Sequence, residues 1–185
     1  MRRRYKIKGV DLKTELIIGF SIVPFILIFG QLAVTLYSSF KNVEFRNIPF
    51  FIFLGGATAG MAVGLMVAKL LGKKMSSFWD IELDDHILNI SFKDRKWSMK
   101  LEEITKLKIF GNPKFKYISI FEDDQNIKMR VGNTGLTPFS TADDLKELED
   151  FIQELQRHFN NNYVKKDGTV KQSPPGTVKL TYLKK

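Results

Sequence analysis

Residues 16–40 read LIIGFSIVPFILIFGQLAVTLYSSF, and residues 48–68 read IPFFIFLGGATAGMAVGLMVA. These stretches are 25 and 21 residues long, and neither contains a charged side chain. A helix needs about 20 residues to cross a hydrocarbon core roughly 30 Å thick. The sequence therefore predicts a transmembrane helical hairpin over residues 16–71, with helices at 16–40 and 48–71. A buried pair of core helices is the weaker alternative, because soluble helices rarely extend this far without a charge.

The basic residues predict how the hairpin is oriented. The segments flanking it carry nine Lys or Arg residues, whereas the seven-residue connector carries only Lys41 and Arg46. Basic residues concentrate on the cytoplasmic side of membrane spans. We therefore expect a multi-pass protein of the bacterial inner (plasma) membrane with both termini in the cytoplasm and residues 1–15 as a basic cytoplasmic arm. A cleaved signal peptide is disfavoured, because the apolar run is too long and no small-x-small cleavage site follows closely.

The net charge of +9 is unevenly distributed along the chain. Residues 78–159 contain 12 Lys or Arg and 16 Asp or Glu, which gives this segment a net charge of −4. The positive excess therefore lies beside the spans and in the last 26 residues, where attraction to anionic lipid explains it. We accordingly expect the lipid bilayer as a partner and no nucleic acid. The absence of cysteine excludes disulfides and thiolate sites.

Small residues recur every fourth position in the second span. Gly56, Gly60, Gly64 and Ala68 would form a smooth stripe on which another helix can pack closely. An antiparallel hairpin places Gln31 level with Gly56, and a lone amide in hydrocarbon needs a partner. Gln31 is therefore expected to face the second span or a partner in an oligomer. The sequence leaves open whether the stripe packs on the first span or on another chain.

From residue 78 the apolar pattern changes to a period of two. Trp79, Ile81 and Leu83 alternate with acidic residues, which is typical of a strand with one buried face. Five similar segments follow up to residue 131, separated by turn residues. They predict an antiparallel sheet of six strands, with a candidate seventh at 136–139.

A helical pattern follows these strands. Thr141 and Asp144 resemble a capping box, with Asp in place of the usual Glu. The next residues place apolar side chains on one helical face: Leu145, Leu148, Phe151, Ile152, Leu155 and Phe159. The predicted fold class is an α+β membrane protein, in which a small antiparallel β-barrel or sandwich over residues 78–159 is capped by this helix.

Three phrases carry a resemblance to a known family: WDIELDDHILNI from Trp79, LEEITKLKI from Leu101 and DLKELEDFI from Asp144. After two spans, they resemble bacterial membrane-anchored pleckstrin-homology-like proteins, including the similar YcxB-like group. The resemblance implies an open barrel that a C-terminal helix caps and a non-enzymatic binding or scaffold module. It carries over no catalytic residue. Residues 78–159 are few for this fold, so a shortened strand is expected.

Candidate site residues are scarce. His86 and His158 lack metal-site spacing, and the sequence contains no HExxH, phosphate-binding glycine loop or G-x-S-x-G motif. We therefore expect no enzyme activity, no cofactor and no metal site. The resemblance points to basic residues on early strand turns, which bind phosphoinositide head groups in eukaryotic relatives. Lys93, Arg95 and Lys96 are the candidates for binding lipid phosphate, and a solvated turn is the alternative.

The last 26 residues are polar and basic, so residues 160–185 are predicted to be disordered. Within them, the alternating segment at 178–182 could instead add a strand to the edge of a partner's sheet. The predicted function is to present the domain at the cytoplasmic face to a protein partner or in a homo-oligomer. The alternative function is an accessory subunit of a transporter or envelope-stress complex that recognises partners through its spans.

Overall fold

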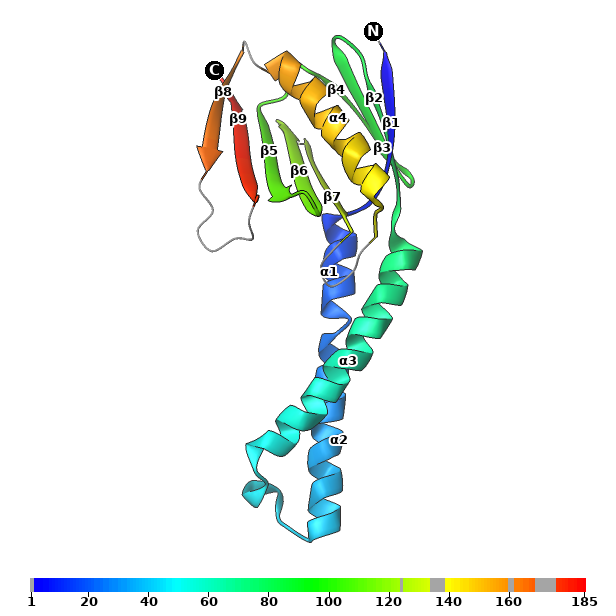
Figure 1. Cartoon of the computed structure of the whole chain (residues 1–185), viewed down its shortest axis with the longest axis vertical. Coiled ribbons are helices and arrows are strands. Elements are labelled where there is room, and N and C mark those ends of the chain that lie inside the picture. The colour runs from blue at the N-terminus through cyan, green and yellow to red at the C-terminus, as the bar shows by residue number, and fades with distance from the viewer. Residues whose placement is uncertain (1, 124, 134–138, 160–161, 169–175) are drawn as a thin grey trace. The chain divides into compact units, whose positions relative to one another are not determined.

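The computed structural model describes residues 2–123, 125–133, 139–159, 162–168 and 176–185 (Figure 1). The chain forms two compact units, one of residues 1–12 and 76–185 and one of residues 13–75. We call the first the sheet unit and the second the apolar hairpin. The elements are β1 (Arg3–Asp11), α1 (Leu12–Phe20), α2 (Val23–Lys41), a 3-10 turn (Phe45–Asn47), α3 (Phe50–Met75), β2 (Ser77–Leu83), β3 (Ile87–Phe92), β4 (Arg95–Lys100), β5 (Lys106–Asn112), β6 (Phe115–Glu122), β7 (Gln125–Gly132), α4 (Ala142–Phe159), β8 (Tyr163–Gly168) and β9 (Val178–Lys184).

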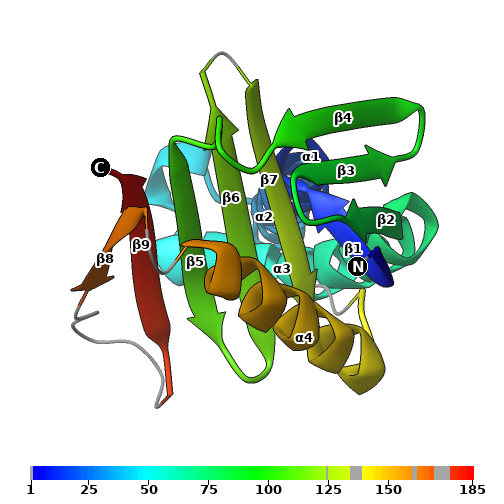
Figure 2. The ribbon, with the colours of Figure 1, turned by 90° about the horizontal axis from the view of Figure 1, so that it is seen from above.

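The strands of the sheet unit form one open antiparallel sheet of nine strands over the described residues (Figure 2). Their order is β4-β3-β2-β1-β7-β6-β5-β9-β8, so β4 and β8 are the edges. The fold is thus α+β as predicted, and the strand content is higher than expected. The predicted seventh strand at 136–139 falls almost entirely outside the described residues.

The N-terminal segment is the main correction to the sequence prediction. Residues 3–11 form β1, which pairs with β2 and with β7 inside the sheet. Tyr5 and Ile7 are buried, whereas Lys6 is exposed, so this segment has the period of a strand. A basic arm over residues 1–15 is therefore wrong. A domain confined to residues 78–159 is also wrong, because β1 supplies a strand that the later sequence lacks.

Gly9 allows β1 to change partners. Gly9 still pairs with Ser77 of β2, but the next residue, Val10, pairs with Arg130 of β7. A Cβ atom on Gly9 would lie 2.5 Å from the carbonyl oxygen of Arg130 and 3.3 Å from the Trp79 ring. Only glycine lets the three strands approach this closely. This position joins the two parts of the sheet.

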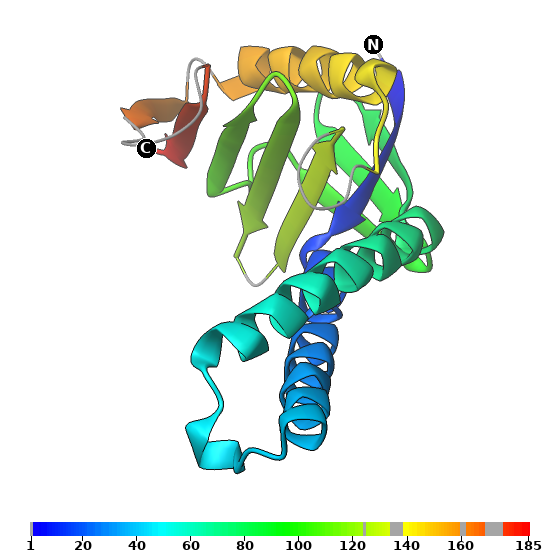
Figure 3. The ribbon, with the colours of Figure 1, turned by 60° about the horizontal axis from the view of Figure 1, so that its bottom comes forward.

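Helix α4 covers one face of the sheet (Figures 2 and 3). The predicted capping box is present: Thr141 Oγ1 accepts from the Asp144 backbone N at 3.2 Å, and Asp144 Oδ2 accepts from the Thr141 backbone N at 2.6 Å. Asp144 Oδ1 also accepts from the backbone N of Lys8, which ties the helix to β1. All of the predicted apolar residues of this helix are buried. The prediction of this helix and its core face is therefore confirmed.

The C-terminal segment adds to the sheet. Strand β9 pairs with β5, and β8 pairs with β9. The buried Tyr163 hydroxyl donates to the carbonyl oxygens of Leu101 and Ile104 at 3.0 and 2.6 Å. Disorder throughout residues 160–185 is therefore wrong. The alternating segment at 178–182 is indeed a strand, but it pairs with β5 of its own chain.

The apolar hairpin contains two helical segments that are long and apolar enough to cross a membrane, Leu12–Lys41 and Phe50–Met75. The first is interrupted between α1 and α2, next to Pro24 at the start of α2. A proline nitrogen cannot donate a helical hydrogen bond, which accounts for the interruption. Helices α2 and α3 pack against each other where Phe29 and Phe25 of α2 meet Gly56 and Gly60 of α3.

Candidate functional site

The three basic residues predicted to bind phosphate do not converge. Lys93 lies in the turn between β3 and β4, where its φ of 54° is in the left-handed region. Arg95 and Lys96 are consecutive residues of β4, so their side chains leave opposite faces of the sheet. The structure therefore does not bring these residues together as one phosphate-binding cluster.

Arg95 has a structural partner. Its guanidinium forms an ion pair with Asp11, whose carboxylate is buried. The guanidinium also lies over the rings of Trp97 and Phe92, at 5.4 and 5.9 Å from their centroids. A buried carboxylate needs such a partner, because its desolvation is costly. Arg95 thus ties β4 to the last residue of β1.

Lys96 faces a shallow, open pocket of about 640 Å³ on the outer face of β1 to β4. Glu82, which also lines this pocket, forms ion pairs with Arg2 and Arg4. These ion pairs lower the pKa of Glu82, with Arg2 making the larger contribution. The lining contains two cations, Arg4 and Lys96, and two carboxylates, Asp80 and Glu82, so the pocket offers little net positive charge to an external anion.

The β3–β4 turn lies at the end of the sheet where the chain leaves for the apolar hairpin and returns from it. Asp11 directly precedes α1, and Ser77 follows α3 after one intervening residue. The register places Gly9 opposite Ser77 and Trp79 opposite Phe92. Both connections to the hairpin and the β3–β4 turn therefore share one end of the sheet unit.

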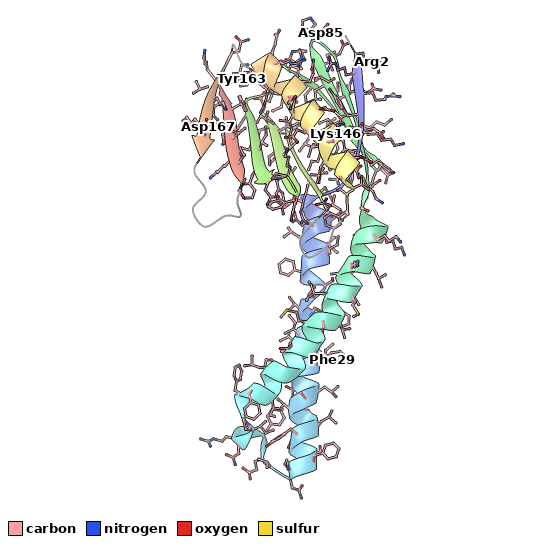
Figure 4. The ribbon with its side chains drawn as sticks, in the orientation of Figure 1. Arg2, Phe29, Asp85, Lys146, Tyr163 and Asp167 are labelled. Atoms are coloured by element: carbon pink, nitrogen blue, oxygen red, sulfur yellow. The ribbon has the colours of Figure 1, made fainter. Side chains whose placement is uncertain are left out.

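The predicted small-residue stripe packs on the first helical segment of the same chain. A Cβ atom on Gly56 would lie 2.3 Å from the Phe29 carbonyl oxygen, and one on Gly60 would lie 2.2 Å from that of Phe25. Gly64 faces Ile22 in the same way, and Ala68 is fully buried. The stripe thus serves the contact within the hairpin (Phe29 is labelled in Figure 4).

Gln31 does not take part in this packing, so it does not face the second span; the other predicted option, a partner in an oligomer, stays a prediction. Phe29 and Ala33 of α2 contact the stripe, and Gln31 lies between them in the sequence. Two residues turn a helix by about 200°, so Gln31 points to the opposite side, and it is exposed. The hydroxyl of the neighbouring Thr35 bonds the Gln31 carbonyl oxygen at 3.0 Å within the helix.

Among the described residues, no group of three or more His, Cys, Asp or Glu side chains could hold a metal ion. His86 is exposed in the turn between β2 and β3, and His158 lies in the last turn of α4.

Sequence reasoning missed a set of cations and aromatic rings on the outer face of β5 to β9. The apolar residues of these strands identified the buried face, and the alternate positions were treated only as solvent-facing. The sequence pattern that could have revealed this set is the alternation of basic or aromatic residues with buried ones. It is present in β5 at Lys106, Lys108 and Phe110. It is present again in β6, at Tyr117 and Phe121.

Comparisons of the chain with protein-family models, with curated proteins and with solved structures find no match. The functional assignment therefore depends on the chain's own chemistry and geometry.

Proposed function

We propose that the chain is a membrane protein whose apolar hairpin crosses the bilayer twice and holds the sheet unit at the cytoplasmic face as a non-enzymatic binding or scaffold module. One observation carries this proposal. The hairpin is inserted between β1 and β2, which are neighbouring antiparallel strands. Its two ends therefore attach to one folded unit, as a two-span hairpin with both ends on one side of a membrane requires.

The exposed surface of the hairpin supports insertion into lipid. In the most apolar windows of its two segments, only 22% and 11% of the residues are buried. Soluble proteins rarely expose a continuous apolar surface of this kind. The exposed side chains include Leu16, Ile17, Phe20, Leu27, Ile28, Leu32, Leu36, Leu54, Met66 and Leu70.

The charges support the cytoplasmic orientation. Lys69, Lys73 and Lys74 lie toward the end of α3 that connects to the sheet unit, whereas Lys41 and Arg46 are the cations near the other end. This asymmetry follows the positive-inside rule. Further support for a pleckstrin-homology-like module comes from the seven strands β1 to β7 followed by α4 on one face of the sheet.

Cysteine labelling tests the topology, because the native chain contains no cysteine. Glu44→Cys places a thiol in the exposed loop between α2 and α3, and His86→Cys places one in the exposed β2–β3 turn. With a membrane-impermeant maleimide on intact bacterial cells, we expect labelling at residue 44 only. Residue 86 should become labelled after lysis. Labelling at residue 86 before lysis, or equal labelling of both, would contradict the proposed topology.

A second candidate function is recognition of a partner helix by the apolar hairpin. The exposed Gln31 amide favours it, because an amide that faces lipid gains stability by bonding another helix. Gln31→Leu should weaken self-association in detergent by about 1 kcal/mol, as measured by energy transfer between labelled chains. Thr35→Val is the matched control, since its hydroxyl already bonds within α2. Unchanged association of the Gln31 variant would argue against this candidate.

Replacing the apolar hairpin with an unrelated two-span hairpin distinguishes the two functions. A binding module on the sheet unit should keep its partners after the exchange, whereas recognition through the spans should be lost.

A further inference from the structure

The outer face of β5 to β9 carries cations and aromatic rings in three adjacent rows. Cross-strand pairing aligns one row over five strands: Lys166, Thr181, Lys108, Ser119 and Lys128. Directly paired residues share a face of the sheet, so these side chains lie side by side. The row on one side contains Lys179, Phe110, Tyr117 and Arg130, and the row on the other contains Lys106, Phe121 and Asn126. We call these three rows the basic face.

Helix α4 covers the other side of these strands, so the basic face is the side away from this helix (Figure 3). Arg130, at the edge of the basic face, is buried, and its guanidinium lies 4.9 Å from the centroid of the Phe139 ring. Lys108, Lys128 and Lys179 are exposed. The intervening residues, such as Ile109 and Ile120, are buried against the core. The lysines are therefore available to a ligand that approaches from outside.

The aromatic rings are interleaved with the cations. The amino groups of Lys106 and Lys108 lie over the Phe121 ring, at 5.6 and 5.5 Å from its centroid. Phe110 and Tyr117 lie 6.1 Å apart between their centroids. Half-buried rings beside lysines are suited to the headgroup level of a membrane, where an apolar body and a polar end are both accommodated.

The basic face contains no acidic residue in its three rows. The acidic residues of these strands, Glu122 and Asp167, project to the other side of the sheet. The pKa of Lys108 is lowered, chiefly by the positive charge of Lys106. Burial and the charges of Lys179 and Lys128 lower it further. The cations thus repel one another, and a negatively charged surface would relieve this repulsion.

The basic face also adjoins the attachment of the hairpin. Arg130, at one end of its aromatic row, pairs with Val10 of β1, and α1 begins two residues later. A single residue, Ser76, separates α3 from β2. Once the hairpin is in a bilayer, such short connections keep the sheet unit within reach of the headgroups, so their effective concentration is high.

We propose that the basic face binds the anionic phospholipid headgroups of the leaflet to which the apolar hairpin ties it. This inference rests on the proposed membrane insertion. The lysine amino groups contact the phosphates, and the rings of Phe110, Tyr117 and Phe121 lie at the level of the headgroups. The site is distinct from the β3–β4 turn, because it lies on the other half of the sheet.

Lysines and aromatic rings on a sheet also suit single-stranded nucleic acid. The tether favours lipid, since it presents headgroups continuously, whereas nucleic acid would have to arrive from solution. Nucleic-acid binding is therefore an outcome of the test and not the proposal.

The experiment measures how close the basic face lies to the lipid. The full chain carries a fluorescent dye on a single cysteine, either Ser119→Cys at the centre of the basic face or Lys146→Cys on the exposed side of α4 (labelled in Figure 4). It is reconstituted into phosphatidylcholine vesicles with or without phosphatidylglycerol, and a headgroup spin-labelled lipid serves as the quencher. We expect strong quenching at residue 119 only with phosphatidylglycerol, and little at residue 146. High salt should abolish it.

A charge variant tests the lysines directly. It combines Lys106→Gln, Lys108→Gln, Lys128→Gln and Lys179→Gln. Docking should weaken about 100-fold or more, so that quenching at residue 119 falls to the level at residue 146. The matched control removes the same number of exposed cations elsewhere and should behave as the native chain: Lys100→Gln, Lys146→Gln, Lys165→Gln and Arg157→Gln.

The possible failures are distinguishable. If alkaline carbonate extracts the chain from the vesicles, membrane insertion fails and the inference fails with it. If the chain stays embedded and residues 119 and 146 are quenched equally, only the lipid docking is overturned. If a single-stranded RNA probe binds the detergent-solubilised chain through the same four lysines and residue 119 is not quenched, the basic face binds nucleic acid and the lipid proposal is overturned.

Discussion

The two halves of the sheet carry similar numbers of basic strand residues but arrange them differently on their outer faces. On the half formed by β1 to β4, the register places Arg4 opposite Glu82 and Lys6 opposite Asp80. On the half formed by β5 to β9, Lys108 lies opposite Ser119 and Thr181. The first half therefore neutralises its own cations, and the second does not.

This difference shows what decides whether a surface lysine or arginine is available to a ligand. An exposed ion pair contributes little to stability, but it does remove a cation from use by an external anion. Directly opposite residues on neighbouring strands are the nearest side-chain neighbours. The cross-strand partner of a basic residue is thus more informative than the number of basic residues that lie close together in the sequence, as at Lys93, Arg95 and Lys96.

The largest effect is expected where the two halves meet. Gly9→Ala would place a Cβ atom 2.5 Å from the Arg130 carbonyl oxygen, so β1 would have to leave β7 or shift against β2. We expect a loss of about 2–3 kcal/mol in the free energy of unfolding. Thermal unfolding of the purified chain in detergent, followed by tryptophan fluorescence, measures it, because Trp79 lies beside this position.

Gly19→Ala is the control for this prediction, since nothing lies within 4 Å of a Cβ atom there. An unfolding midpoint of Gly9→Ala equal to that of the control would show that β1 does not bridge the halves as described.

The second half depends on the anchor that holds its last two strands. Tyr163→Phe removes the donor that serves the carbonyl oxygens of Leu101 and Ile104. We expect a loss of about 1–2 kcal/mol. Burial raises the pKa of Tyr163 from 10.0 to about 12. The neutral hydroxyl therefore stabilises the fold fully below pH 10, and this contribution is lost as the pH rises from 10 through 12.

Thermal unfolding midpoints measured across that alkaline range check the prediction. The native chain should lose stability more steeply than Tyr163→Phe, and Tyr37→Phe in α2 should follow the native chain. Parallel curves for the native chain and Tyr163→Phe would contradict the proposed anchor.

The sequence allowed much of this fold to be predicted, because its apolar residues follow clear periods. Strands β2 to β7, helix α4 and the glycine stripe at Gly60 and Gly64 follow from local patterns. The residues of β1 alternate as well, but their cations lie next to an apolar segment and suggested an arm. Their partners in β2 and β7 are more than 60 residues away, and no local pattern identifies such a pairing.

The candidate site was less predictable, since it depends on side-chain direction. Gln31 was placed at the right level of the hairpin, but the rotation of α2 is set by Phe25 and Phe29 packing on α3. By sequence, Arg95 belonged to a basic turn; in the structure it forms an ion pair with the buried carboxylate of Asp11. The basic face arises only after five strands align, two of them from the segment expected to be disordered.

A single carboxylate should convert the second half to the behaviour of the first. Ser119→Glu places an acid directly opposite Lys108 and Lys128. It should raise the pKa of Lys108 back toward its ordinary value, because the acid offsets the repulsion from Lys106. Side-chain ¹⁵N NMR of lysine measures this change, and the lipid-quenching assay should show weaker docking. Ser98→Glu on the outer face of β4 should leave both unchanged. If the docking of Ser119→Glu is unchanged, the charge balance around Lys108 does not govern lipid binding.

The smallest effect is expected from the reverse change, which frees cations on the first half. Arg2, and to a smaller extent Arg4, lowers the pKa of Glu82. The Glu82 carboxylate therefore stabilises the fold above its ordinary pKa of 4.5, and this contribution is lost as the pH falls below that value. Glu82→Gln should therefore flatten the acid side of the thermal stability profile only slightly, since both arginines of these ion pairs are exposed. The freed Arg2 and Arg4 should also give the first half a weak attraction to phosphatidylglycerol vesicles. Asp80→Asn removes the same charge from the same strand but keeps the arginine pairs and frees only Lys6, so its attraction to these vesicles should be the weaker of the two. If both variants bind anionic lipid equally, net charge governs the attraction and cross-strand pairing does not.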